Sequence, residues 1–198
     1  MKSILISIKP KWCAKIMNGD KTIEVRKKFP KDYVGWVYLY CSKKDGFTGK
    51  IRDGVDCYDG ELYKYNFDKG HKVKEKKGLF YDGETLINSI NGKVVARFWC
   101  DKVEEILNYG LARRSEIMME DLLKKSCLTM RQLNKYAPHK EYKDDDYIYA
   151  IHISKLEIFN KPKELSEFWN CGKQVRKGVF NYSIIHKAPI NYCYIEGE

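Results

Sequence analysis

Three charged residues near the N-terminus, Lys21, Glu24 and Arg26, have the types and the spacing to bind a polar ligand. Apolar and polar residues alternate here, so a β-strand would place Glu24 and Arg26 on one face, just after Lys21. A guanidinium can hold a phosphate or a base edge through two hydrogen bonds, and a carboxylate can accept from an amine such as cytosine N4. We therefore expect this strand to line a binding cleft. The alternative is a structural ion pair, which contributes little when exposed.

The segment around these residues, 9–28, carries seven Lys and Arg against two acids. Basic side chains interleaved with aromatic ones suit single-stranded nucleic acid, because charge holds the phosphates and ring faces stack on the bases. The ligand-binding residues that this pattern predicts are Lys9, Lys11, Trp12, Lys21, Glu24, Arg26, Lys28, Tyr40 and Ser42. For Trp12 the alternative is packing into the core, and for Lys28 it is a solvated strand end.

Lys21 is the residue expected to be catalytic if the protein is an enzyme. A lysine acts as a base or nucleophile near neutral pH only when burial or neighbouring cations lower its pKa. Lys9 and Arg26 would lower the pKa of Lys21, whereas Glu24 would raise it. The sequence leaves that balance open, and with it the question of catalysis.

Short elements on either side of Lys21 follow from local signals. Residues 3–8 alternate as a first strand. Pro10 suits the first position of a helix, and Gly19 suits the left-handed residue that ends one. The strand that carries Glu24 comes next, and residues 36–41 form another.

Farther along, the pattern predicts more strands than helices. Strands are expected at 92–100, at 147–159 with an end at Lys161-Pro162, and at 189–195; helices should start near Ser115 and Thr129. Long connections and few βαβ units argue against a doubly wound sheet. We expect an α+β fold, a mostly antiparallel β-barrel with short helices covering its ends.

Residues 43–86 differ in composition from the rest of the chain. They contain repeated Asp-Gly pairs, which are typical of hairpins and tight loops. They also lack the apolar residues needed for a core of their own. We therefore interpret them as an inserted loop or hairpin region within one domain, 1–198.

The overall charge favours polyanionic partners. The chain of 198 residues has 37 Lys and Arg against 27 Asp and Glu, a net charge of +10. Its seven cysteines lack disulfide or zinc spacing, which favours reduced thiols and a cytoplasmic protein with no metal or other cofactor. No stretch has the roughly 20 apolar residues of a membrane span, so no membrane partner is expected. The oligomeric state is not predicted.

Residues 19–26, GDKTIEVR, resemble the G-x-K-x-x-E-x-R signature of the ASCH domain, a branch of the PUA-like superfamily. The surrounding order is similar as well: a strand ending at 8–10, a short helix, the signature, and a strand that includes 40–42. Later blocks that also resemble this family are residues 92–95, 128–136, 150–153, 161–165 and 188–194. The resemblance covers nearly the whole chain except 43–86.

This resemblance implies a PUA-like barrel with a cleft for RNA or modified nucleobases. Some small ASCH relatives are amidohydrolases that deacetylate N4-acetylcytidine, and there the signature lysine works with a threonine at the position of Glu24. Lys21 is present here, but Glu24 replaces that threonine, which counts against the amidohydrolase activity. Other members are regarded as ribonucleases.

Three hypotheses follow for the function. The first is binding of RNA or a nucleotide-like ligand in a basic cleft. The second is a hydrolase that acts on a modified nucleoside or on RNA, with Lys21 as the catalytic residue. The third is a protein-interaction module whose basic face has no direct role.

Overall fold

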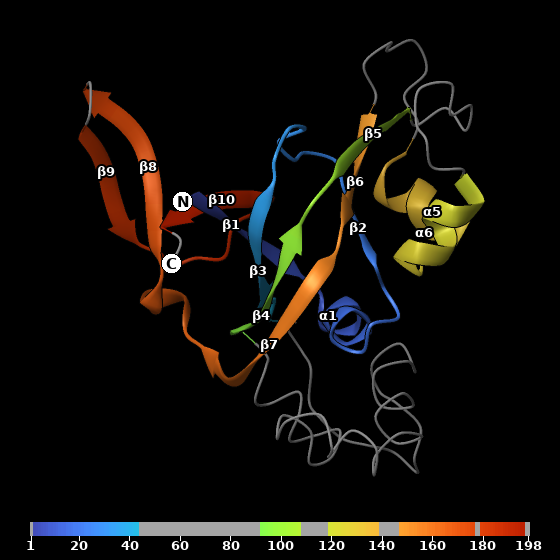
Figure 1. Ribbon diagram of the computed structural model, residues 1–198, viewed down its shortest axis with the longest axis horizontal. Coiled ribbons are helices and arrows are strands. Elements are labelled where there is room, and N and C mark those ends of the chain that lie inside the picture. Colours follow the sequence, from blue (N-terminus) through green and yellow to red (C-terminus); the bar gives the residue numbers. More distant parts are fainter. Residues whose placement is uncertain (1, 44–91, 108–118, 139–146, 177–178, 197–198) are drawn as a thin grey trace.

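A computed structural model describes residues 2–43, 92–107, 119–138, 147–176 and 179–196, and in this part of the chain most elements are strands (Figure 1). A seven-stranded sheet has the spatial order β7 (Ser154–Lys163), β4 (Val94–Cys100), β3 (Gly35–Cys41), β1 (Lys2–Ile8), β10 (Tyr192–Glu196), β8 (Trp169–Arg176) and β9 (Val179–Ile184). A three-stranded sheet has the order β2 (Ile23–Arg26), β6 (Tyr147–His152) and β5 (Val103–Leu107). The helical elements are α1 (Pro10–Met17), α5 (Met119–Ser126), α6 (Met130–Tyr136) and the 3₁₀ turn η1 (Leu165–Glu167).

The predicted α+β class, with mostly antiparallel strands, is confirmed. Every described strand pair is antiparallel except β1 with β3. The described strands form two sheets that are not closed into one barrel, so the barrel is not confirmed. The expected insertion at 43–86 lies almost entirely outside the described residues.

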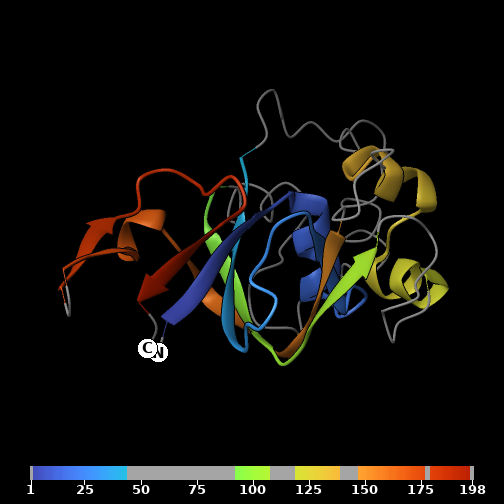
Figure 2. The same cartoon turned by 90° about the horizontal axis from the view of Figure 1, so that it is seen from above.

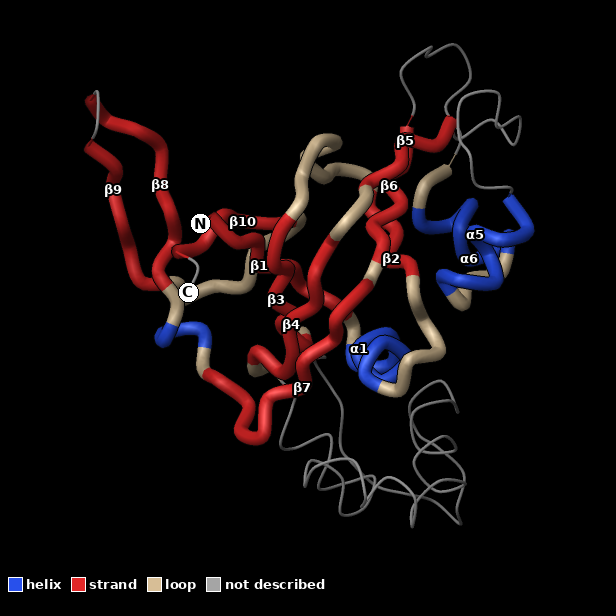
Figure 3. The backbone as a smooth tube through the Cα atoms, viewed as in Figure 1, coloured by secondary structure: helices blue, strands red, loops and turns tan. Residues whose placement is uncertain are grey.

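The α-helices gather on the side of the molecule where the small sheet lies (Figures 2 and 3). Helix α1 packs Cys13, Ile16 and Met17 against the buried face of the large sheet. Helices α5 and α6 pack Leu122 and Leu133 against the small sheet instead. Strand β2 therefore lies between two apolar clusters, with α1 on one side and α5 on the other.

Two strand predictions differ from the structure. The predicted strand at 147–159 divides after residue 152, because β6 belongs to the small sheet and β7 to the large one. Pro162 does not end β7, which runs to residue 163. As the edge strand of its sheet, β7 can accommodate a proline, whose missing N–H interrupts no central ladder.

The end of α1 has the predicted geometry. Gly19 has φ +80°, the Gly19 N–H donates to Ile16 O at 2.9 Å, and the Asp20 N–H donates to Lys15 O at 3.0 Å. These two bonds form a Schellman motif, in which a left-handed residue turns the chain out of the helix. The motif delivers the chain directly to Lys21 and β2.

Replacing Gly19 by alanine should destabilise the fold through backbone conformation alone. No atom lies within 4 Å of the position that a Cβ would take, so the cost is the left-handed conformation, about 1–2 kcal/mol. Urea denaturation of Gly19→Ala measures this loss. Gly19→Asn, which tolerates the left-handed region, should retain most of the stability; equal losses in both variants would contradict this account.

Candidate functional site

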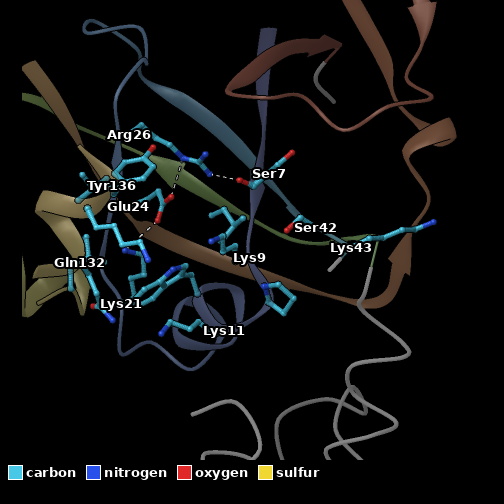
Figure 4. Close-up of a pocket in the computed structure, with 16 residues that line it drawn as sticks. Ser7, Lys9, Lys11, Lys21, Glu24, Arg26, Ser42, Lys43, Gln132 and Tyr136 are labelled. Atoms are coloured by element: carbon cyan, nitrogen blue, oxygen red, sulfur yellow. Dashed lines mark hydrogen bonds and ion pairs between the residues drawn. The ribbon is translucent and has the colours of Figure 1, made fainter. Parts of the chain in front are cut away.

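Lys21, Glu24 and Arg26 form one row of buried ionic contacts. Lys21 Nζ lies 3.2 Å from Glu24 Oε2, and Arg26 Nε lies 3.0 Å from Glu24 Oε1. The three residues are only 2%, 7% and 9% exposed. Glu24 thus sits between two cations and engages one with each oxygen, as Figure 4 shows. The predicted cluster exists, but it is buried among its own members rather than displayed on an open strand face.

Both ends of this row are attached to other elements. Lys21 Nζ donates to Ser126 O at 2.8 Å, and Arg26 Nη2 donates to Ser7 O at 2.5 Å. Ser126 is the last residue of α5, where helix carbonyls lack intrahelical partners and attract a cation. The row therefore connects the C-terminus of α5, strand β2 and strand β1.

The turn after α5 presents this carbonyl to Lys21. Cys127 has φ 55°, and the N–H groups of Cys127 and Leu128 donate to the carbonyls of Lys124 and Leu123. This second Schellman motif leaves Ser126 O available to the lysine. The Thr22 N–H also donates to Lys125 O at 2.9 Å, which fixes α5 to the chain beside Lys21.

Burial lowers the pKa of the Lys21 ammonium below its ordinary value of 10.5, and the nearby Glu24 carboxylate opposes that effect. The loss of water around the ammonium is the larger cause, and Arg26 adds to it by repulsion. Lys21 should therefore lose its proton at a lower pH than the exposed lysines of the chain.

A pocket of about 700 Å³ lies above this row, between α1 on one side and α6 on the other. Its floor consists of Glu24 and Arg26 of strand β2, together with Lys21 just before that strand. The residues that line it are Ser7, Ile8, Lys9, Pro10, Lys11, Trp12, Lys21, Glu24, Val25, Arg26, Ser42, Lys43, Leu128, Gln132, Lys135 and Tyr136.

Most of the predicted site residues line this pocket. They are Lys9, Lys11, Trp12, Lys21, Glu24, Arg26 and Ser42. Trp12 packs against the core cluster and also lines the pocket, and its role in ligand binding stays a prediction. Its ring has Lys11 Nζ at 4.6 Å and Lys21 Nζ at 5.4 Å from the centroid, in cation–π contact.

Lys28 and Tyr40 do not line the pocket. Lys28 is exposed just beyond the end of β2, which agrees with the alternative of a solvated strand end. Tyr40 is buried with Tyr38 and Phe168 in an apolar cluster, whereas its neighbour Cys41 packs in the cluster that contacts α1. Adjacent strand residues point to opposite faces of a sheet, so Tyr40 points away from α1 and the pocket.

The sequence did not reveal the contribution of α6. Gln132, Lys135 and Tyr136 lie at i, i+3 and i+4 on that helix and form the wall opposite α1. Burial raises the pKa of the Tyr136 hydroxyl, and the adjacent Arg26 guanidinium partly offsets this. The only signal in the sequence was the spacing of a polar, a basic and an aromatic residue along a short predicted helix.

The described residues contain no group of three or more His, Cys, Asp or Glu that could hold a metal ion. None of the six cysteines in the described residues forms a disulfide. No described helix is both long enough and apolar enough to cross a membrane. His152 is partly exposed and contacts Glu104 Oε1 through Nε2 at 2.6 Å.

Comparison with solved structures identifies the fold. The crystal structure of ASCH from Zymomonas mobilis matches with a TM-score of 0.51 over 98% of this chain and 87% of that one, at 12% sequence identity. The chain has an ASCH-type fold. Two mutants of the same Zymomonas mobilis ASCH protein match with TM-scores of 0.50, also at 12% identity, over 99% and 98% of this chain and 91% and 88% of those chains. No protein-family model matches the sequence, and no curated protein matches it.

Within this ASCH-type fold, the signature residues have a clear structural position. The G-x-K part supplies the Schellman glycine and the lysine at the end of α5, and the E-x-R part supplies the rest of the ionic row. The signature therefore specifies the pocket floor and its attachment to two neighbouring elements.

Glu24→Gln should be strongly destabilising, because it leaves two buried cations without their counterion. Breaking a buried ion pair by removing one partner costs about 3–5 kcal/mol. The matched control is Glu157→Gln, which breaks an ion pair to Arg97 in which the Glu157 side chain is 49% exposed. That variant should lose less than about 1 kcal/mol in urea denaturation. Similar losses in the two variants would contradict a buried, energetically important row.

The lowered pKa of Lys21 can be observed directly. In a pH titration followed by ¹³C NMR of the lysine Cε atoms, one resonance should titrate at lower pH than the others. The Lys21→Met variant should lack that resonance. If all lysine resonances titrate together in the parent protein, the effect of burial at Lys21 is absent.

Proposed function

We propose that this protein binds RNA or a nucleotide-like ligand in the pocket between α1 and α6. The observation that carries the proposal is the charge of the lining. Six basic residues, namely Lys9, Lys11, Lys21, Arg26, Lys43 and Lys135, face one acid, Glu24, which leaves a net charge of +5 (six minus one). Because Glu24 already engages two of these cations, the field in the pocket attracts anions.

Aromatic rings on both walls support nucleic acid over a simple anion. Trp12 belongs to α1 and Tyr136 to α6, so each wall of the pocket carries one aromatic residue. Stacking on such rings tolerates any base, while the lysines hold the phosphates. RNA binding is also what the resemblance of residues 19–26 to the ASCH signature implies.

Lysines at the pocket should dominate binding of a short single-stranded RNA. Lys9→Ala/Lys135→Ala removes one cation from each wall, whereas Lys31→Ala/Lys124→Ala removes two exposed cations that do not line the pocket. Both variants change the net charge equally. We measure binding by fluorescence anisotropy titrations over a range of salt concentrations. The first variant should bind the RNA at least about tenfold more weakly, and its plot of log binding constant against log salt concentration should be less steep by about 1–2. Equal losses in both variants would show that only overall charge matters.

A hydrolase that uses Lys21 is the second candidate function, because a buried lysine with a lowered pKa lines the pocket. Two contacts count against it: Lys21 Nζ is held by Ser126 O and by Glu24, which leaves little freedom for a nucleophile. Incubation with N4-acetylcytidine and with short RNA, analysed by chromatography, decides the matter. Turnover that disappears in Lys21→Met would establish an enzyme; if neither binding nor turnover occurs, both functions are wrong.

A further inference from the structure

The carboxylate oxygens on the pocket floor already engage other side chains of the protein. Among the described residues that line the pocket, Glu24 is the only carboxylate, and its two oxygens face Lys21 Nζ and Arg26 Nε. At 7% exposure, Glu24 has little surface left for a ligand. A base amine would have to displace one of two buried cations to reach it, and stranding a buried charge is costly. This geometry favours Glu24 as the residue that orients Lys21 and Arg26, and its acceptance of a hydrogen bond from cytosine N4 stays a prediction.

The side chain of Gln132, on the α6 wall, is held in a fixed orientation. Its Oε1 accepts from the Thr129 N–H at 3.0 Å, and the Thr129 hydroxyl accepts from the Gln132 N–H at 3.2 Å. This reciprocal capping box fixes the orientation of the Gln132 amide, because only its oxygen can accept a hydrogen bond from a backbone N–H. The remaining polar group, Nε2, is a donor only.

The exposed nitrogen group beside Gln132 is a donor as well, because Lys135 lies on the same wall and cannot accept a hydrogen bond. Lys21 Nζ is held by Ser126 O and Glu24 Oε2 and is only 2% exposed, so it contributes charge to the pocket rather than a hydrogen bond to a ligand. Apart from the Tyr136 hydroxyl, which can donate or accept, the polar side chains described on the α6 wall thus present N–H donors to a ligand.

We infer that this pocket selects bases with a keto oxygen at the position where cytosine and adenine carry their amino group, namely uracil (O4) and guanine (O6), with Gln132 as the specificity-determining residue. This inference rests on the proposed function, because it assumes that a base enters the pocket. A keto oxygen accepts hydrogen bonds from these N–H groups. An amino group at the same position would place its own N–H bonds against them, and no hydrogen bond would form. Discrimination at one such contact amounts to about tenfold in affinity.

The test compares oligouridine with oligocytidine of equal length in anisotropy titrations. The two strands carry the same phosphate charge, so the ratio of their Kd values isolates the recognition of the base edge. We expect oligouridine to bind about tenfold more tightly to the parent protein. Binding of both strands with a ratio near one, or tighter binding of oligocytidine, would overturn the inference while leaving the proposed function intact. Binding of neither strand would overturn both.

Gln132→Glu tests the role of this residue and has a matched control. Glutamate also forms a capping box with Thr129, so one carboxylate oxygen keeps the cap while the other becomes an acceptor toward the pocket. The preference should fall to about one or reverse toward oligocytidine. Asn134→Asp adds the same charge to an exposed position of α6 that does not line the pocket. It should weaken both strands equally and leave the ratio unchanged; a parallel change of ratio in both variants would exclude Gln132 as the specificity residue.

Discussion

The row that runs from the Ser126 carbonyl through Lys21, Glu24 and Arg26 to the Ser7 carbonyl determines how the small and large sheets are joined. Two cations and one carboxylate have been removed from water, and each is compensated by its neighbours or by a backbone carbonyl. Such an arrangement is stable only as a complete unit, because loss of one member leaves a buried charge unpaired. The position of α5 relative to β2 therefore depends on these side chains.

This constraint also determines what the pocket can do. Because Glu24 is occupied by Lys21 and Arg26, it neutralises part of the floor without presenting an acceptor to a ligand. The lysines of the two walls then make the electrostatic potential in the pocket positive, and Trp12 and Tyr136 supply apolar surfaces. The binding site that we propose therefore depends on the structural role of the ionic row, in which Lys21 is a member.

Local rules predicted the parts of the site that depend on local geometry. Pro10 and Gly19 marked the ends of α1, and alternation placed Glu24 and Arg26 on one strand face. Alternation could not show that Lys21 is buried against the Ser126 carbonyl, because α5 is distant in sequence. Nor does the sequence show the side of the sheet on which Tyr40 lies, since that depends on which face packs against α1. The α6 wall was missed because Gln132 and Lys135 carry no signal of function until the fold places them opposite Trp12.

The most direct test of the central claim is a crystal structure of the protein with a bound ribonucleotide trimer. The account predicts that a phosphate lies among the lysines of the pocket walls and that a base lies between Trp12 and Tyr136, with the contacts of Glu24 to Lys21 and Arg26 intact. Density for the trimer on another surface, or a base amine bonded to Glu24 in place of either cation, would contradict it.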